Sequence, residues 1–299
     1  MSKFVTIFRD QVNAQECDIM GHFNIQFYAA KVADGLSASM GKIGLPDSAG
    51  ISVQHKAAFS HYQGELHVDD ELEVRAAILA VGDDHIRLLA EIINSGTGKL
   101  SSSFDLHCQA CDTDSRRPTT WPDRIRDELA TRIIDLPVQK RIPTAGTHVP
   151  ASAGSSANAF VSSRGTIDAW DCDERGAMCL RQYYAIASDG IGPLRHRMGI
   201  TRDLAKTRHW GGAGLEYFVR FLAPIDAGDI YTLRTGLLQV AEKTFRVGHR
   251  LFNDSSGDLT ATFDIVACMF DLQARRTMKI PDEIRTQAEM MLIDWSVPV

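Results

Sequence analysis

A carboxylate, an imidazole and an amide stand close together near the start of the chain. They belong to Asp18, His22 and Asn24, with Gly21 among them, in the stretch CDIMGHFN. Residues at even spacing point to the same side of an extended segment, so these three side chains are expected to converge on one pocket. A carboxylate, an imidazole and an amide in one place can support hydrolysis of an activated acyl group.

A helix is expected to begin just after this stretch, at about Asn24. Its first amide N–H groups have no partner within the helix, so they can donate hydrogen bonds to an oxyanion that develops on a substrate. Gly21 permits a tight turn or the close approach of a ligand. A structural interpretation stays open beside the catalytic one, with Asp18 and Asn24 capping the helix and His22 in a turn.

The stretch from Glu16 to Gly35 recurs without a gap from Asp171 to Gly190. The copy keeps the acid, as Asp173, but has Ala177 and Cys179 in place of the imidazole and the amide. An active site that is complete in one copy and incomplete in the other would explain this difference.

The repeat extends over nearly the whole chain. After a four-residue insertion the offset between the copies changes from 155 to 159, and the match continues to PDRIR at Pro122 and PDEIR at Pro281. One gap therefore aligns both halves, which indicates a tandem duplication. A segment rich in Pro, Gly, Ser and Ala separates them, as is typical of a linker. The predicted domains are residues 1–135 and 160–299, joined by a linker at 136–159.

Both halves are predicted to fold in the same order, as a strand, a long helix, three or four strands and a short closing helix. In the first half, apolar residues recur at helical spacing at Ile25, Tyr28, Val32 and Leu36. Strands are expected at residues 71–82, 85–98 and 100–111, between turns rich in Gly and Asp. The predicted fold class is α+β, with two modules in which a long helix packs against an antiparallel sheet.

This module, with D-x-x-G-H-x-N at the helix entrance, resembles the hotdog-fold acyl-CoA thioesterases, in particular the 4-hydroxybenzoyl-CoA thioesterase-like branch. The resemblance implies that Asp18 is the catalytic carboxylate, as general base or as nucleophile. The stretch is also similar to the D-x-N-x-H-x-N motif of plant acyl-ACP thioesterases, with Met20 in place of the first Asn. His22 and Asn24 would then orient water or the acyl group.

The resemblance further implies a double hotdog, in which two modules pack as a pseudo-dimer and the active site lies between them. One complete site would contain Asp18, and the site at Asp173 would be degenerate, its acid kept for a structural reason such as helix capping. Glu216 has Ala57 as its counterpart in the first half. It is predicted to reach across and complete the Asp18 site, or else to be an exposed strand acid with an ionic partner.

A basic cluster in the second half is the candidate binding site for the phosphates of coenzyme A. Its arginines are Arg195, Arg197, Arg202 and Arg208. A guanidinium group can donate two parallel hydrogen bonds to the oxygens of one phosphate. A run of charges is also typical of a solvated surface. Coenzyme A would enter as part of the substrate, and no cofactor is expected.

The composition limits the classes of partner. The net charge is −6 over 299 residues, which argues against nucleic acid and membrane surfaces as partners. No run of about 18 apolar residues predicts a membrane span. The 6 cysteines are scattered, as in a reduced cytoplasmic protein, and the pair Cys108 and Cys111 has no second ligand pair, so no metal site is expected.

The sequence thus predicts a cytoplasmic acyl-CoA thioesterase, with an acyl carrier protein as a possible second kind of substrate carrier. Assembly of double-hotdog chains into a homo-oligomer stays open. Two alternatives also stay open: a hotdog enoyl-CoA hydratase or dehydratase, and a non-catalytic acyl-CoA-binding protein. The first would be expected to carry an Asn-Pro step between the acid and the histidine, which this chain lacks.

Overall fold

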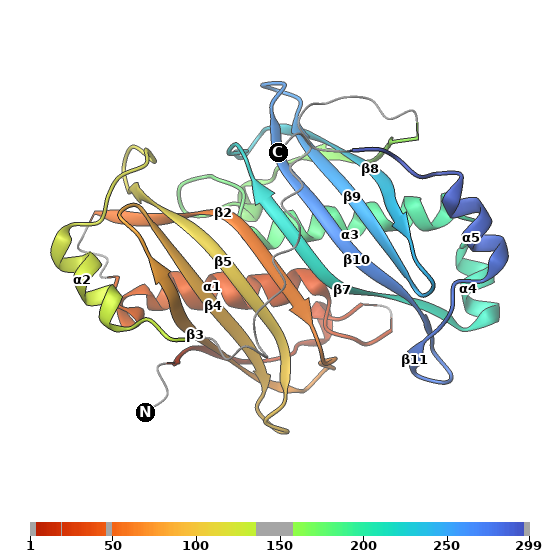
Figure 1. The fold of residues 1–299 in the computed structure, drawn as a ribbon, viewed down its shortest axis with the longest axis horizontal. Coiled ribbons are helices and arrows are strands. Elements are labelled where there is room, and N and C mark those ends of the chain that lie inside the picture. Colours follow the sequence, from red (N-terminus) through yellow and green to blue (C-terminus); the bar gives the residue numbers. More distant parts are fainter. Residues whose placement is uncertain (1–3, 19, 46–49, 136–157, 296–299) are drawn as a thin grey trace. The chain divides into compact units, whose positions relative to one another are not determined.

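The chain divides into two compact units, Met1–Ala145 and Gly146–Val299 (Figure 1). The computed structural model describes residues 4–18, 20–45, 50–135 and 158–295. Most of the predicted linker, residues 136–157, therefore lies outside the described residues.

The first unit has the predicted order of elements, a strand and a long helix followed by four strands and a short helix. They are β1 (Val5–Gln11), the short helix η1 (Ala14–Glu16), α1 (Ile25–Ile43), β2 (Ile51–Tyr62), β3 (Glu71–Val81), β4 (His85–Asn94), β5 (Leu100–Asp112) and α2 (Asp123–Thr131). The strands form an antiparallel sheet in the order β1-β3-β4-β5-β2. Figure 1 shows α1 lying along one face of this sheet.

The second unit repeats this architecture. Its elements are β6 (Phe160–Thr166), η4 (Ala169–Asp171), α3 (Leu180–Arg197), α4 (Arg202–Arg208), β7 (Trp210–Phe221), β8 (Ile230–Val240), β9 (Thr244–Asn253), β10 (Leu259–Asp271), β11 (Arg276–Thr277) and α5 (Asp282–Glu289). The sheet order is β6-β8-β9-β10-β7, with β11 paired to the far end of β10. The tandem repeat is confirmed, and α4 is where the sequence has its insertion.

Helix α1 forms as its pattern of apolar residues predicts. Tyr28, Val32 and Leu36 are buried, because their spacing places them on the side that faces the sheet. The helix ends at Gly44, which has the left-handed backbone angle φ +105° that ends many helices. These contacts fix the direction of α1 and therefore the position of its N-terminus.

A glycine brings each long helix close to its sheet. A Cβ atom on Gly35 would lie 2.9 Å from Cβ of Phe8, and one on Gly190 would lie 2.5 Å from a methyl carbon of Leu233. The two glycines are repeat counterparts, so the close approach is a shared feature of both modules. Among the described residues, no helix is both long enough and apolar enough to cross a lipid bilayer.

Candidate active site

The backbone from Asp18 to His22 forms a tight turn that the carboxylate of Asp18 holds from inside. Oδ1 of Asp18 accepts hydrogen bonds from the backbone N–H groups of Met20 at 2.8 Å and His22 at 3.1 Å. The main chain closes the same turn, since Asp18 N–H donates to the carbonyl of His22 at 2.8 Å. Gly21 has φ +79°, a backbone angle that glycine adopts without strain.

The predicted extended segment is therefore wrong. Asp and Asn side chains can accept hydrogen bonds from backbone groups a few residues ahead, and this competes with regular extended structure. Because the chain turns, alternation along the sequence does not place the side chains of Asp18, His22 and Asn24 on one side. Each of the three has its own surroundings in the folded chain.

The second module has the same turn. Oδ1 of Asp173 accepts from the N–H groups of Arg175 at 2.9 Å and Ala177 at 3.0 Å, and Gly176 has φ +81°. Asp173 therefore holds a turn, whereas helix capping was the role suggested for it. The acid has a structural role in both modules, whatever further role Asp18 has.

The N-terminus of α1 combines a capped start with one available donor. Asn24 is the N-cap residue, and its Oδ1 accepts from Gln26 N–H at 3.2 Å, as the structural interpretation predicted. The N–H of Asn24 donates to the backbone carbonyl of Glu16, and the N–H of Phe27 donates to the backbone carbonyl of Asn24. Among the residues that the structure describes, none accepts from the N–H of Ile25, which leaves this donor for a ligand.

A buried ion pair anchors the segment that leads into this turn. Nζ of Lys31, on α1, lies 2.5 Å from Glu16 and 2.6 Å from Asp10. Burial lowers the pKa of Lys31, but the hydrogen bonds that its ammonium group donates to the two carboxylates outweigh this effect, so the pKa is raised and the charge is retained. The second module also buries an acid here, Asp171, but pairs it with Arg181. The sequence showed the repeated acid but not its partners.

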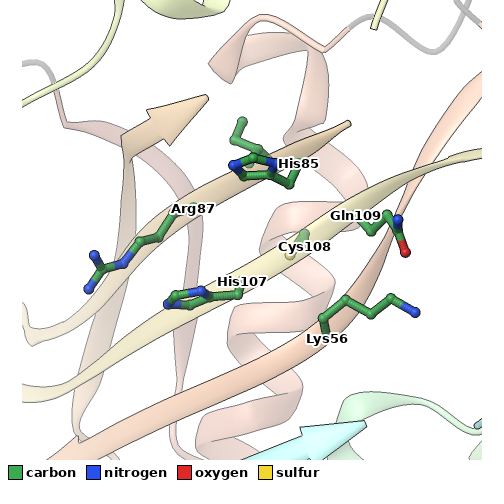
Figure 2. Close-up of a pocket in the computed structure, with 7 residues that line it drawn as sticks. Lys56, His85, Arg87, His107, Cys108 and Gln109 are labelled. Carbon is green, nitrogen blue, oxygen red and sulfur yellow. The ribbon is translucent and has the colours of Figure 1, made fainter. Parts of the chain in front are cut away.

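Residues of β2, β4 and β5 line a pocket of about 380 Å³. Figure 2 shows side chains that line it. The polar side chains around it include Lys56, His85, Arg87 and His107. The guanidinium of Arg87 forms an ion pair with the carboxylate of Asp105. The sequence analysis did not predict this pocket, because its residues come from three strands and show no motif along the chain.

The two cysteines of the lone C-x-x-C pair do not form a metal site. Cys108 and Cys111 are three residues apart on β5, so their side chains point to opposite faces of the sheet. Sγ of Cys108 lies 3.4 Å from Nδ1 of His55, and burial raises the pKa of this thiol to about 12. Cys108 is therefore a neutral thiol and a poor nucleophile.

The four predicted phosphate-binding arginines lie on two successive helices of the second unit. Arg195 and Arg197 are at the end of α3, and Arg202 and Arg208 bound α4. The guanidinium of Arg197 lies 4.0 Å from the ring centre of Phe160, and that of Arg208 lies 5.8 Å from the ring centre of Trp210. Two of the four thus stack on aromatic rings. Binding of phosphate by this group stays a prediction.

Glu216 lies on β7, opposite Val266 of β10. It belongs to the second unit, whereas Asp18 belongs to the first. Its approach to the Asp18 site stays a prediction.

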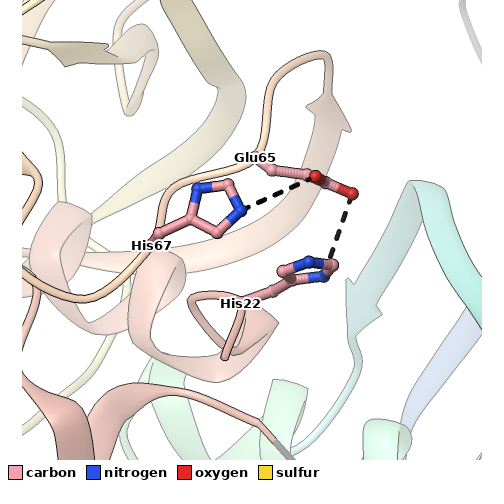
Figure 3. Close-up of side chains that lie close together, drawn as sticks. All are labelled: His22, Glu65 and His67. Carbon is pink, nitrogen blue, oxygen red and sulfur yellow. Dashed lines mark ion pairs between the residues drawn. The ribbon is translucent and has the colours of Figure 1, made fainter. Parts of the chain in front are cut away.

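The imidazole of His22 faces two residues that the sequence analysis missed. Nδ1 of His22 lies 3.8 Å from Oε1 of Glu65, and Nε2 of His67 lies 3.9 Å from Oε2 of the same carboxylate (Figure 3). Both residues lie in the connection between β2 and β3. A comparison of the copies could have found them, because the second module has Pro224 and Asp226 at these positions.

The first module therefore has three groups capable of chemistry near the start of α1. Asp18 is half-buried, and among the described residues none donates a hydrogen bond to its Oδ2. Oδ2 can take a proton from water or attack a carbonyl carbon. The N–H of Ile25 can stabilise negative charge, and the imidazole of His22, 18% exposed, can exchange a proton or bind a metal ion.

The family model described as the thioesterase-like superfamily matches residues 12–129 and, a second time, residues 167–288. Each match covers most of one module, and together they span more than half of the chain. Each match also contains one of the two Asp turns.

One curated protein of similar sequence is L-carnitine dehydrogenase/betainyl-CoA thioesterase from Agrobacterium fabrum (strain C58). The two are 28% identical over 129 residues, which cover 41% of this chain and 26% of that protein. The chain therefore matches about a quarter of the length of this curated relative.

Two solved structures resemble the chain over most of its length. The 12:0-ACP thioesterase from Umbellularia californica has a TM-score of 0.63 and 13% identity, over 89% of this chain and 94% of that one. An acyl-ACP thioesterase from Bacteroides thetaiotaomicron VPI-5482 has a TM-score of 0.62 and 12% identity, over 89% of this chain and 100% of that one. At this level of identity the likeness shows a shared fold, the hotdog fold.

Proposed function

Because the chain belongs to the thioesterase-like superfamily, we propose that it hydrolyses an acyl-CoA thioester to the free acid and coenzyme A. One observation carries the proposal beyond family membership. The two modules share one turn, held by one kind of acid, yet the first alone has an imidazole, His22, at its end. A side chain that the turn does not require is available for chemistry.

In the proposed reaction, water attacks the thioester carbonyl and gives its proton to Oδ2 of Asp18, the carboxylate oxygen that does not hold the turn. The carbonyl oxygen becomes negatively charged and accepts a hydrogen bond from the N–H of Ile25. The C–S bond then breaks, and the sulfur leaves as a thiolate that takes up a proton. Asp18 can instead attack the carbonyl directly, which forms an anhydride that water then opens.

The other predicted residues have supporting roles in this proposal. Asn24 caps α1 and so fixes the direction of the Ile25 N–H, a positioning role. His22 orients the attacking water or the acyl group. Glu216 completes the site from the second module, and the arginines of α3 and α4 bind the phosphates of coenzyme A.

We further propose that the chain has one working site. The second module retains the turn at Asp173 but has Ala177 in place of the imidazole and Cys179 as an N-cap that accepts no side-chain hydrogen bond. The shared acid is accounted for by the turn, so its presence in the second module does not require a second active site.

The experiment is a screen for thiol release with the purified chain, over short, long, branched, aromatic and charged acyl-CoA substrates. A parallel series uses acyl groups carried by an acyl carrier protein, as in the names of two related structures. Release of free thiol from at least one acyl-CoA supports the proposal. Release from the carrier-protein series alone would contradict the choice of coenzyme A, and tight acyl-CoA binding without any release would contradict the hydrolase.

A further inference from the structure

Three possible metal ligands meet in the first unit, from two segments that are distant in sequence. His22 ends the Asp18 turn, and Glu65 and His67 stand on either side of Leu66 in the β2–β3 connection. The two segments run antiparallel where they meet, and His22 and His67 form an isolated β-bridge. Figure 3 shows the carboxylate of Glu65 directed towards both imidazole rings.

The distances within this group leave room for an ion. The two His–Glu separations, 3.8 Å and 3.9 Å, are too long for hydrogen bonds. One ligand atom from each of the three residues lies within 4.8 Å of the others. Ligand atoms about 2.1 Å from a tetrahedral zinc ion lie about 3.4 Å apart, so rotamer adjustments of about 1 Å would close the group around an ion.

The backbone holds the two ligands from the β2–β3 connection in place. Leu66, between them, is fully buried, its carbonyl accepts from Phe23 N–H at 2.8 Å, and its N–H donates to the hydroxyl of Tyr28 at 3.3 Å. The N–H of His67 donates to Asp70 at 2.8 Å. Little backbone ordering is therefore needed to bind an ion, which favours affinity.

A carboxylate also lies near the outer ring nitrogen of His67, where metal-binding histidines usually have a hydrogen-bond partner. Its Nε2 faces Glu65, while its Nδ1 lies 3.8 Å from the carboxylate of Asp70. Like the two His–Glu separations, 3.8 Å is too long for a hydrogen bond, and a similar rotamer adjustment would let Nδ1–H donate to Asp70. Such a hydrogen bond orients a metal-binding imidazole and increases its basicity as a ligand.

The second module shows that the fold does not need these three side chains. Their counterparts are Ala177, Pro224 and Asp226. The backbone bridge is nevertheless retained, between Ala177 and Asp226. The ligand group of the first module is thus an addition to a scaffold that forms without it.

We propose that His22, Glu65 and His67 bind one divalent transition-metal ion of the zinc type, with a fourth coordination position open to water. Two imidazoles and one carboxylate are a ligand set that zinc accepts and that magnesium and calcium do not favour. The bound ion occupies Nδ1 of His22, so this imidazole is withdrawn from other chemistry. Zinc is therefore expected to inhibit thioester hydrolysis, a consequence that rests on the proposed function, whereas the binding itself does not.

The test is a cobalt titration of the full-length chain after treatment with a chelator. Tetrahedral cobalt absorbs in the visible range, so the spectrum reports the coordination directly and needs no enzymatic activity. The expected result is a visible band that saturates at one ion per chain and disappears when zinc is added. Magnesium and calcium should not displace the cobalt.

Three variants locate the site. His22→Ala introduces alanine, the residue that the second module has at the equivalent position, and should keep the turn. His67→Ala removes the other imidazole. Each should weaken cobalt binding by more than about 100-fold, since even outer partners of a metal site contribute about 10- to 100-fold. The control is His85→Ala, because His85 is also paired with a carboxylate, Asp84 at 3.0 Å, and should leave the affinity unchanged.

Two outcomes would overturn the proposal. If the wild-type chain gives no cobalt band, the three residues form an ordinary cluster of ion pairs. If His22→Ala and His67→Ala bind cobalt as tightly as the wild type, the ion is held elsewhere, for example by cysteine thiols. Thermal unfolding of each variant verifies that lost binding does not come from lost folding.

Discussion

The carboxylate of Asp18 accepts the backbone N–H of His22 at 3.1 Å, so the acid holds the imidazole-bearing residue by its main chain. The equivalent contact in the second module joins Asp173 to Ala177 at 3.0 Å. A turn that forms equally well around an alanine does not depend on the imidazole. Substitution of His22 can therefore remove the imidazole without unfolding the turn.

The first prediction concerns the imidazole itself. His22→Ala should lower the rate of thiol release by about 100-fold, because the attacking water or the acyl group loses the imidazole that orients it, and a misplacement of about 1 Å can cost that much. The free energy of unfolding should change little, because the backbone hydrogen bonds with Asp18 remain. Steady-state kinetics and urea unfolding measure the two quantities. Unchanged hydrolysis would remove His22 from the proposed mechanism.

The second prediction uses the different N-caps of the two long helices. Asn24→Cys should cost about 1 kcal/mol of stability, because the hydrogen bond to Gln26 N–H is lost. The reverse change in the second module, Cys179→Asn, should stabilise by a similar amount, since Cys179 makes no such bond. Urea unfolding of both variants checks this. If neither changes the midpoint, capping does not limit stability here.

These positions show which features of the structure could be predicted from the sequence. The module order and the start of α1 followed from apolar spacing, the Asn24 cap and the internal repeat. The turn at Asp18 could not be predicted from alternation, because it depends on hydrogen bonds between a side chain and the backbone. Glu65 and His67 could not be placed beside His22, because the path of the β2–β3 connection depends on tertiary packing.

The third prediction concerns the buried pair of Glu16 and Lys31. The residue equivalent to Lys31 in the second module is Ile186, where the cation comes from Arg181 instead. Lys31→Ile should cost about 3–5 kcal/mol, because a buried carboxylate is left without its counter-ion.

Adding Gln26→Arg to that variant should recover part of the loss, because residue 26 is the counterpart of Arg181. The free energy of unfolding of the single and double variants, measured with urea, is the readout. If the double variant is no more stable than Lys31→Ile, an arginine at position 26 does not replace Lys31 as the counter-ion of Glu16.

The fourth prediction is a pH dependence in the second module. His249 is 1% exposed, its Nδ1 lies 2.7 Å from the hydroxyl of Thr235, and burial lowers its pKa to about 3. The unfolded chain takes up a proton on this histidine below about pH 6.5, whereas the folded chain does not. Above about pH 6.5 neither state carries this proton, and the free energy of unfolding has its full value. As the pH falls from about 6.5 towards 3, the free energy of unfolding decreases by up to about 1.4 kcal/mol per pH unit, because only the unfolded chain takes up the proton.

Unfolding free energies at several pH values between neutral and mildly acidic conditions test this. The variant His249→Gln, which cannot take up a proton, should show a shallower dependence than the wild type. His85→Gln, at an exposed histidine, is the matched control. Equal slopes for wild type and His249→Gln would mean that the folded chain accepts a proton on His249.

The central claim is that the first module alone carries a working carboxylate, and paired substitutions at the two turns test it most directly. In Asp18→Asn and Asp173→Asn the new side chain still offers Oδ1 to the backbone N–H groups, so both turns should remain folded. Thiol release from the best acyl-CoA should fall by about 100- to 10,000-fold in Asp18→Asn and stay near the wild-type rate in Asp173→Asn. Near wild-type hydrolysis by Asp18→Asn, or equal losses in the two variants, would contradict the claim.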